Sequence, residues 1–136
     1  QLPSTFAPED WSFTFFECMS RYPFSEFHNK HMVELGCGNG WISLSVAMKY
    51  SCSKIYGLDI NPKAILCSKI NLFLNAFDQN GEMILCDDGY TLFDKVEFKV
   101  SDLLSYFFEN RSTGFDVIIG CIPQVLAPEV ALMLLM

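Results

Sequence analysis

Glycine recurs at every second position in one loop of the sequence, directly after a short apolar segment that contains a carboxylate. Residues 31–35 read His-Met-Val-Glu-Leu, and Gly36, Gly38 and Gly40 follow. Glycine has no Cβ, so it adopts positive φ and lets the main chain approach a ligand closely. The G-x-G-x-G spacing differs from the dinucleotide fingerprint G-x-G-x-x-G. It favours a ligand that has no pyrophosphate.

A second carboxylate stands in register with this loop. Residues 55–60 are predicted to form a strand, and Asp59 near its carboxyl end follows the loop by about 20 residues, where α/β nucleotide-binding folds place the acid that binds a ribose. Asn61 and Pro62 then suit a helix start, as N-cap and first helical residue. Loop and acid together predict a site for S-adenosylmethionine. The alternatives are a glycine-rich turn that binds nothing and an acid that only favours a helix start.

Helical and strand-like segments alternate along the chain, which is typical of a parallel α/β sheet. Apolar stripes predict helices whose apolar faces are buried, over 11–22, 42–50 and 66–77. Short apolar runs predict strands at 31–35, 55–60, 96–100 and 115–123. Ligands bind at the carboxyl ends of such strands, so the glycine loop, Asp59, Asp102 and residues 121–124 are expected to converge.

The composition fits one globular domain and disfavours polyanionic partners. Of the 136 residues, 51% are hydrophobic, which is enough for a core in a domain of this size. The formal net charge of −7 disfavours nucleic acid, whose binding depends on lysine and arginine against phosphate. A small or neutral substrate is expected, and no stretch is apolar enough to span a bilayer.

The cysteines and histidines indicate neither a disulfide framework nor a metal site. Six cysteines are scattered without C-x-x-C pairs, at positions 18, 37, 52, 67, 86 and 121. His28 and His31 have no further candidate ligands at suitable spacing. Free thiols in a reducing compartment, the cytoplasm, are therefore expected.

Two parts of the chain are predicted, with one boundary between them. Residues 1–30 form an aromatic helical lead-in, and residues 31–136 form the ligand-binding part. An acidic segment at 78–94 contains Asn-Gly and Asp-Gly pairs, so it is interpreted as a surface hairpin or a solvated loop inserted into that part.

Several motifs then carry a resemblance to a known family. The chain resembles class I S-adenosylmethionine-dependent methyltransferases, and within them the plant methionine S-methyltransferases. The resemblance rests on PEDWSFTF (8–15), VELGCGNGWIS (33–43), KIYGLDINPKA (54–64), INLFLNA (70–76), VEF with SDLLSY (96–106) and IIGCIPQVL (118–126). It implies a Rossmann-like fold of which this sequence supplies the first four strands. The chain is thus expected to be an incomplete domain from a longer protein, whose relatives also carry an aminotransferase-like region.

The resemblance also implies roles for individual residues. Asp59 would bind the ribose of S-adenosylmethionine, and Asp102 with Leu103 its adenine. The methionine moiety would lie at Glu34, Gly36, Gly38 and Gly40, and the cofactor-binding set is completed by Cys37 and Ile60. The methyl acceptor would be positioned by Cys121, Ile122, Pro123 and Gln124.

The acceptor segment departs from the pattern of related enzymes. Methyltransferases that act on amide or exocyclic nitrogens carry Asn-Pro-Pro-Tyr where this chain has Cys121-Ile122-Pro123-Gln124. Because the orienting amide and the stacking ring are absent there, the resemblance favours transfer to the sulfur of L-methionine, giving S-methylmethionine. The alternatives are an N-methyltransferase of protein glutamine or of a nucleobase, and a noncatalytic module that binds the cofactor.

Overall fold

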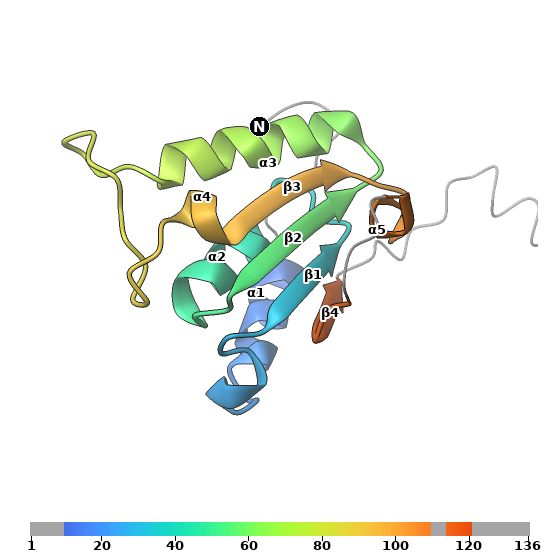
Figure 1. Cartoon of the computed structure of the whole chain (residues 1–136), viewed down its shortest axis with the longest axis horizontal. Helices are drawn as coiled ribbons and strands as arrows, with labels where there is room; N and C mark the ends of the chain where they lie inside the picture. Colours follow the sequence, from blue (N-terminus) through green and yellow to red (C-terminus); the bar gives the residue numbers. More distant parts are fainter. Residues whose placement is uncertain (1–9, 110–113, 121–136) are drawn as a thin grey trace, which may run out of the picture.

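The computed structural model describes residues 10–109 and 114–120, which form a small sheet with helices on both faces (Figure 1). The strands are β1 (His31–Leu35), β2 (Lys54–Asp59), β3 (Val96–Val100) and β4 (Val117–Gly120). The helices are α1 (Asp10–Met19), the short 3-10 helix η1 (Phe24–Glu26), α2 (Trp41–Lys49), α3 (Pro62–Asn75), α4 (Leu92–Lys95) and α5 (Ser105–Glu109).

All four strands are parallel, in the order β3-β2-β1-β4. Met32 of β1 lies beside Ile55 of β2 on one side and Val117 of β4 on the other. The predicted α/β class and parallel sheet are confirmed. Within the described part of the chain, β4 is an edge strand.

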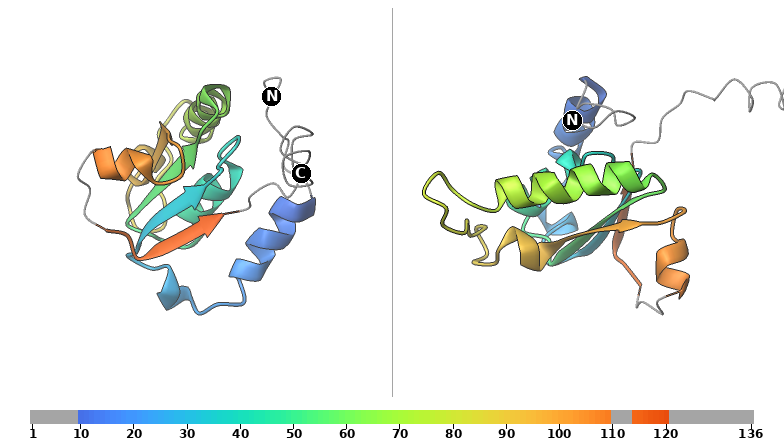
Figure 2. Two further views of the ribbon diagram at one scale, coloured as in Figure 1. Left: turned by 90° about the vertical axis from the view of Figure 1, so that its right-hand side faces the viewer. Right: turned by 90° about the horizontal axis from the view of Figure 1, so that it is seen from above.

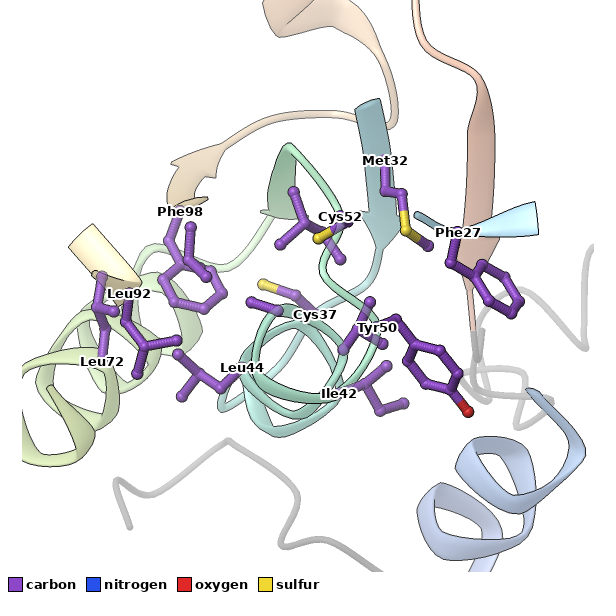
Figure 3. Close-up of a cluster of buried hydrophobic side chains, with 14 of the residues drawn as sticks. Phe27, Met32, Cys37, Ile42, Leu44, Tyr50, Cys52, Leu72, Leu92 and Phe98 are labelled. Atoms are coloured by element: carbon purple, nitrogen blue, oxygen red, sulfur yellow. The ribbon is translucent and has the colours of Figure 1, made fainter. Parts of the chain in front are cut away.

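The helices divide between the two faces of the sheet. Figure 2, left, shows α1 and α2 on one face and α5 on the other. Alternate residues of β1 enter different clusters, because successive side chains of a strand point to opposite faces: Met32 joins the large core cluster and Val33 the smaller one with Phe107 of α5. The large cluster carries most of the buried apolar side chains (Figure 3).

The prediction that the apolar stripe of α3 faces the core is wrong. Leu66, Ile70, Phe73 and Leu74 are all exposed, and the buried face of α3 consists of Ala64, Ile65, Cys67, Ser68 and Leu72. The lead-in helix is predicted correctly only in part. Met19 is buried, but Cys18 and Tyr22 of the same predicted face are exposed.

The acidic segment lies largely at the surface, as predicted: residues 78–83, 85, 87–90, 93 and 94 are exposed. Two isolated antiparallel bridges, Phe77 with Met83 and Leu85 with Thr91, give it a partial hairpin character. Its last residues belong to α4, which Thr91 and Asp94 start with a reciprocal capping box. The carboxylate of Asp88 also pairs with a buried lysine, Lys95, at 2.6 Å between Oδ2 and Nζ.

The fourth strand begins two residues later than predicted, at Val117. It is described as far as Gly120, and the predicted residues 121–123 lie outside the described part of the chain. Asp116 precedes it: its backbone N–H donates to the carbonyl of His31, and its Oδ2 accepts from the backbone N–H of His31, both at 2.8 Å. This exchange fixes the amino ends of β1 and β4 together. Among the described helices, none is long and apolar enough to cross a membrane.

Candidate functional site

Two glycines of the loop after β1 face open space. Gly36 and Gly38 have φ values of +69° and +55°, and a Cβ added to either would meet no atom within 4 Å. Their backbone conformation is one that side-chain-bearing residues rarely adopt. The loop therefore presents bare main chain at the carboxyl end of β1, where a ligand can approach it.

Gly40, the third glycine of the loop, is required for a different reason. A Cβ on Gly40, at φ +80°, would lie 2.5 Å from Cζ of Phe98 and 2.8 Å from Cβ of Ser68. A Cβ on Gly57 would also lie 2.5 Å from the Phe98 ring. The ring thus fills the space between β2 and the start of α2, and Gly40 is required by packing. The sequence analysis did not predict this contact. The only sign of it in the sequence is Gly57, because a glycine inside a strand often marks the close approach of another group.

Asp59 joins the loop to the start of α3. Its Oδ2 accepts from the backbone N–H of Gly38 and its Oδ1 from that of Asn61, each at 2.9 Å. The side chain is half-buried. A carboxylate offers about four acceptor positions, so both oxygens keep capacity for ligand hydroxyls. The predicted N-cap is confirmed: Asn61 Oδ1 accepts from the backbone N–H of Lys63, and Pro62 is the first helical residue.

Glu34 lies below the loop rather than on its surface. It is buried, and its Oε2 accepts from both the backbone N–H of Ser43, at 3.0 Å, and the Ser43 hydroxyl. Burial raises the pKa of this carboxyl from its ordinary value of 4.5 to about 7. Glu34 therefore ties β1 to the first turn of α2, the helix that follows the glycine loop.

Cys37 also points inward. Its side chain is buried in the large cluster that Figure 3 shows, and its backbone N–H donates to the carbonyl of Leu58 at 2.9 Å. Burial raises the pKa of its thiol well above the usual range, so the thiol stays protonated. Any contact of Cys37 with a ligand would come through its backbone.

The ends of β2 and β3 contribute an apolar pair. Ile60 and Leu103 are 67% and 61% exposed, unusually open for large aliphatic side chains. Ser101 shapes the turn between them: its backbone N–H donates to the carbonyl of Asp59 at 2.9 Å, and its hydroxyl donates to the carbonyl of Leu103 at 2.7 Å. Leu103 has a φ of +49°, a strained conformation that is often stored at binding sites. Asp102 in the same turn is exposed.

One further residue supports the loop from α3. The amide Nδ2 of Asn71 donates to the carbonyl of Asn39 at 2.9 Å, and Oδ1 of Asn39 accepts from the backbone N–H of Trp41 at 3.1 Å. Periodicity could place Asn71 on a helix but could not indicate that contact.

The described structure thus brings together the loop, Asp59, Ile60, Asp102 and Leu103 at adjacent strand ends. The predicted acceptor residues 121–124 lie outside the described part. In the residues that are described, no cluster of three or more potential metal ligands occurs.

Comparison with known proteins identifies the family. Residues 14–119 match the methyltransferase small domain. The chain belongs to this family. A methionine S-methyltransferase from Zea mays is 55% identical over 129 residues, 95% of this chain and 12% of that enzyme. A release factor glutamine methyltransferase from Dictyoglomus turgidum is 31% identical over 100 residues, 74% of this chain and 30% of that protein.

The fold agrees with the family. A solved structure described as a precorrin 8W decarboxylase, from Methanobacterium thermoautotrophicum, superposes with a TM-score of 0.58 at 20% identity, covering 88% of this chain and 53% of that one. The predicted Rossmann-like methyltransferase fold is confirmed. This methyltransferase domain spans about 12% of the length of the methionine S-methyltransferases that it matches.

Proposed function

We propose that this chain binds S-adenosylmethionine and, in its full-length protein, serves methyl transfer to the sulfur of L-methionine, giving S-methylmethionine. The observation that supports methionine as the methyl acceptor is the 55% identity to a methionine S-methyltransferase over 95% of the chain. The identity to a glutamine methyltransferase is 31% over 74% of the chain. The similarity to the methionine enzyme extends through the loop, Asp59 and the β3 turn.

The described residues fit the cofactor. Gly36 and Gly38 leave room at the loop for the methionine moiety, and Asp59 has acceptor positions for ribose hydroxyls. Ile60 and Leu103 provide exposed apolar surface suited to an adenine ring. When bound, the cofactor supplies a methyl group activated by a positively charged sulfur.

In this proposal Glu34 and Cys37 act indirectly. Glu34 holds α2 against β1 through Ser43, and Cys37 anchors the loop to β2 through Leu58. Both keep the loop in the conformation that exposes its backbone. Rigid support of this kind places a ligand for reaction without contributing a reacting group.

The proposed acceptor explains why no general base is needed. A thioether sulfur carries no proton, so its methylation releases none. The protein then has to align the sulfur with the methyl group and exclude water. We assign that task to Cys121, Ile122, Pro123 and Gln124, which follow β4 directly. They would lie at the same edge of the sheet as the loop.

Cellular context forms part of the proposal. The cysteines at 18, 37, 52, 67 and 86 are free, which suits a reducing compartment such as the cytoplasm. The remainder of a longer parent protein would complete the acceptor half of the domain, and that protein would also carry a separate aminotransferase-like region.

The test uses the full-length protein that contains this chain, with S-adenosylmethionine labelled on its methyl group. Label should pass to free methionine, and not to a glutamine-containing release-factor peptide or to nucleic acid. Transfer to the peptide or to nucleic acid, with none to methionine, would overturn the proposed acceptor. Cofactor binding with transfer to none of the three would identify a noncatalytic module.

A further inference from the structure

We propose that the ionised carboxylate of Glu34 shifts binding at this site toward S-adenosylmethionine and away from its product, S-adenosylhomocysteine. The inference rests on the proposed function and adds a residue that distinguishes the two ligands by their charge. They differ in one methyl group, which gives the sulfur of S-adenosylmethionine a positive charge. The ammonium and carboxylate groups are the same in both. The ratio of the two affinities therefore reports on the methyl group and the charge that it brings.

Two carboxylates lie at the neighbouring strand ends that flank the glycine loop. Glu34 is 2% exposed on β1, and the half-buried Asp59 is the last residue of β2. Glu34 lies beside Gly57 in the sheet, so Asp59 follows two residues further along the neighbouring strand. Burial is the main cause that raises the pKa of Glu34, and the negative charge of Asp59 adds to it. When Glu34 is ionised, the loop therefore has two negative charges next to it.

None of the described residues forms an ion pair with either carboxylate. The ion pairs within the described ranges lie elsewhere: Lys54 and Lys99 with Glu97, and Lys95 with Asp88. Residues 36–40 of the loop carry no charge, and Lys63, the lysine nearest to Asp59 along the chain, is exposed on α3. A positively charged ligand stabilises the ionised form of a nearby carboxylate. The charge that Glu34 lacks in the protein can thus come from the ligand.

The groups that act on Glu34 come from three elements. Ser43 of α2 donates to it from its backbone N–H at 3.0 Å and from its hydroxyl. The loop contributes the thiol of Cys37, which stays protonated, and β2 contributes Asp59. Burial outweighs the donors of Ser43 and raises the pKa of Glu34 to about 7, so its charge changes close to neutral pH. A positive charge nearby lowers such a pKa, whereas a neutral ligand brings no charge to do so.

The preference for S-adenosylmethionine should therefore increase with pH. Below about pH 7 Glu34 is protonated and does not distinguish the ligands by charge, and above it the carboxylate attracts the positive sulfur. A unit charge about 10 Å away shifts a pKa by about one unit at an effective dielectric constant of about 20, which corresponds to a tenfold change in affinity.

The same effect would assist turnover. Methyl transfer moves the positive charge from the sulfur of the cofactor to the sulfur of the acceptor. Once S-methylmethionine has left, the ligand that remains is neutral, and the carboxylate of Glu34 no longer stabilises it by charge. A new molecule of S-adenosylmethionine then displaces the product more readily.

The test compares the calorimetric affinities of the full-length protein for the two ligands at about pH 5.5 and pH 8.5. The α-amino groups of the ligands also titrate in this range, so Glu34→Gln supplies the baseline. Relative to that variant, the affinity of the wild type for S-adenosylmethionine divided by its affinity for S-adenosylhomocysteine should rise about tenfold from the lower to the higher pH.

Two further variants complete the test. Glu97→Gln is the matched control, because this strand carboxylate is already paired with Lys54 and Lys99, and it should keep the wild-type pH dependence. Ser43→Ala removes a hydroxyl that favours the ionised form of Glu34, so the midpoint of the change should move to higher pH. The same pH dependence in the wild type and Glu34→Gln would overturn this inference while leaving the proposed cofactor in place. So would a midpoint that Ser43→Ala does not move. Binding of neither ligand at either pH would overturn the proposed function, and this inference with it.

Discussion

The backbone N–H of Gly38 donates to Oδ2 of Asp59 at 2.9 Å, so one of the two open glycines of the loop is held by the acid at the end of the neighbouring strand. Oδ1 of the same carboxylate accepts from Asn61 at the start of α3. One side chain therefore sets the position of the loop relative to the helix. The two motifs that suggest a cofactor in the sequence are a single hydrogen-bonded unit in the structure.

Replacing Asp59 should therefore weaken cofactor binding through two effects. Asp59→Ala removes the acceptor for ribose hydroxyls and releases Gly38 as well. The loss should be about 1.5–3 kcal/mol, the usual value of hydrogen bonds to a charged group. Calorimetric titration with S-adenosylhomocysteine measures it, and Asp87→Ala, an exposed acid in the 78–94 segment, is the control. Equal affinity of Asp59→Ala and the wild type would remove Asp59 from the site.

Alanine substitutions of Gly38 and Gly40 should have different effects: the first should impair cofactor binding, and the second should impair stability. Gly38→Ala meets no neighbour and costs only its positive φ, about 1 kcal/mol, but it should impair cofactor binding. Gly40→Ala brings a Cβ within 2.5 Å of the Phe98 ring, and it should lower the free energy of unfolding by about 2–4 kcal/mol. Urea unfolding and calorimetric titration of both variants distinguish the classes.

The Gly40 variant has its own control. Phe98→Leu makes room beside Gly40, so the double variant Gly40→Ala with Phe98→Leu should lose less stability than the sum of the two single changes. Strict additivity would show that the ring does not set the requirement for glycine.

Local patterns in the sequence predicted the elements well, because strands and caps depend on neighbouring residues. The β1 strand, the Asn61 cap and Pro62 at the helix start are confirmed. The orientation of α3 was predicted wrongly: a period of 3.6 shows that a helix has an apolar face, but not that this face meets its own sheet. Its buried face uses small residues such as Ala64 and Ser68, which packing against β3 and the loop requires.

Contacts between distant residues could not be predicted in the same way. Phe98 beside Gly40 and Lys95 beside Asp88 depend on how the strands stack and how the 78–94 segment folds back. Glu34 was assigned to the ligand by resemblance, and the structure shows that its carboxylate also holds Ser43. A motif gives the position of a residue in the family pattern, whereas its partners follow only from the tertiary structure.

Glu34 should make stability depend on pH in a direction that is unusual for an acid. Its pKa is raised by burial from 4.5 to about 7, so between these values the folded protein holds a proton that the unfolded chain has released. Stability from this group is therefore full at low pH and falls as pH rises, by about 3 kcal/mol once the pH exceeds 7. The Glu34→Gln side chain cannot ionise, so the variant escapes this loss. Its free energy of unfolding relative to the wild type should therefore rise by about 3 kcal/mol between low pH and pH above 7.

Urea unfolding at about pH 4.5 and pH 8 measures this difference. Glu97→Gln is the control: burial opposes ionisation of Glu97, but hydrogen bonds from Lys99 and Lys54 outweigh it and lower its pKa. Its stability difference from the wild type should not change over the same range. A constant difference for Glu34→Gln would show that folding does not raise the pKa of the Glu34 carboxyl.

Removing either partner of the ion pair between Asp88 and Lys95 should lower the free energy of unfolding by different amounts. Lys95 is 1% exposed, whereas the Asp88 side chain is 22% exposed, and Nζ lies 2.6 Å from Oδ2. Asp88→Ala leaves a buried charge without its partner and should cost about 3 kcal/mol of unfolding free energy. Lys95→Met keeps the apolar stem and leaves a carboxylate that water reaches, so it should cost about 1 kcal/mol or less.

The double variant Asp88→Ala with Lys95→Met should therefore be more stable than Asp88→Ala alone, because the second change removes the unpaired charge. Asp87→Ala is the matched control: Asp87 is the adjacent acid, it is exposed, and its loss should change stability by less than about 0.5 kcal/mol. Urea unfolding of the four variants gives the ranking. If Asp88→Ala cost no more than Asp87→Ala, the 78–94 segment would not be anchored to the sheet by this pair, and its position beside α4 would rest on the bridge between Leu85 and Thr91.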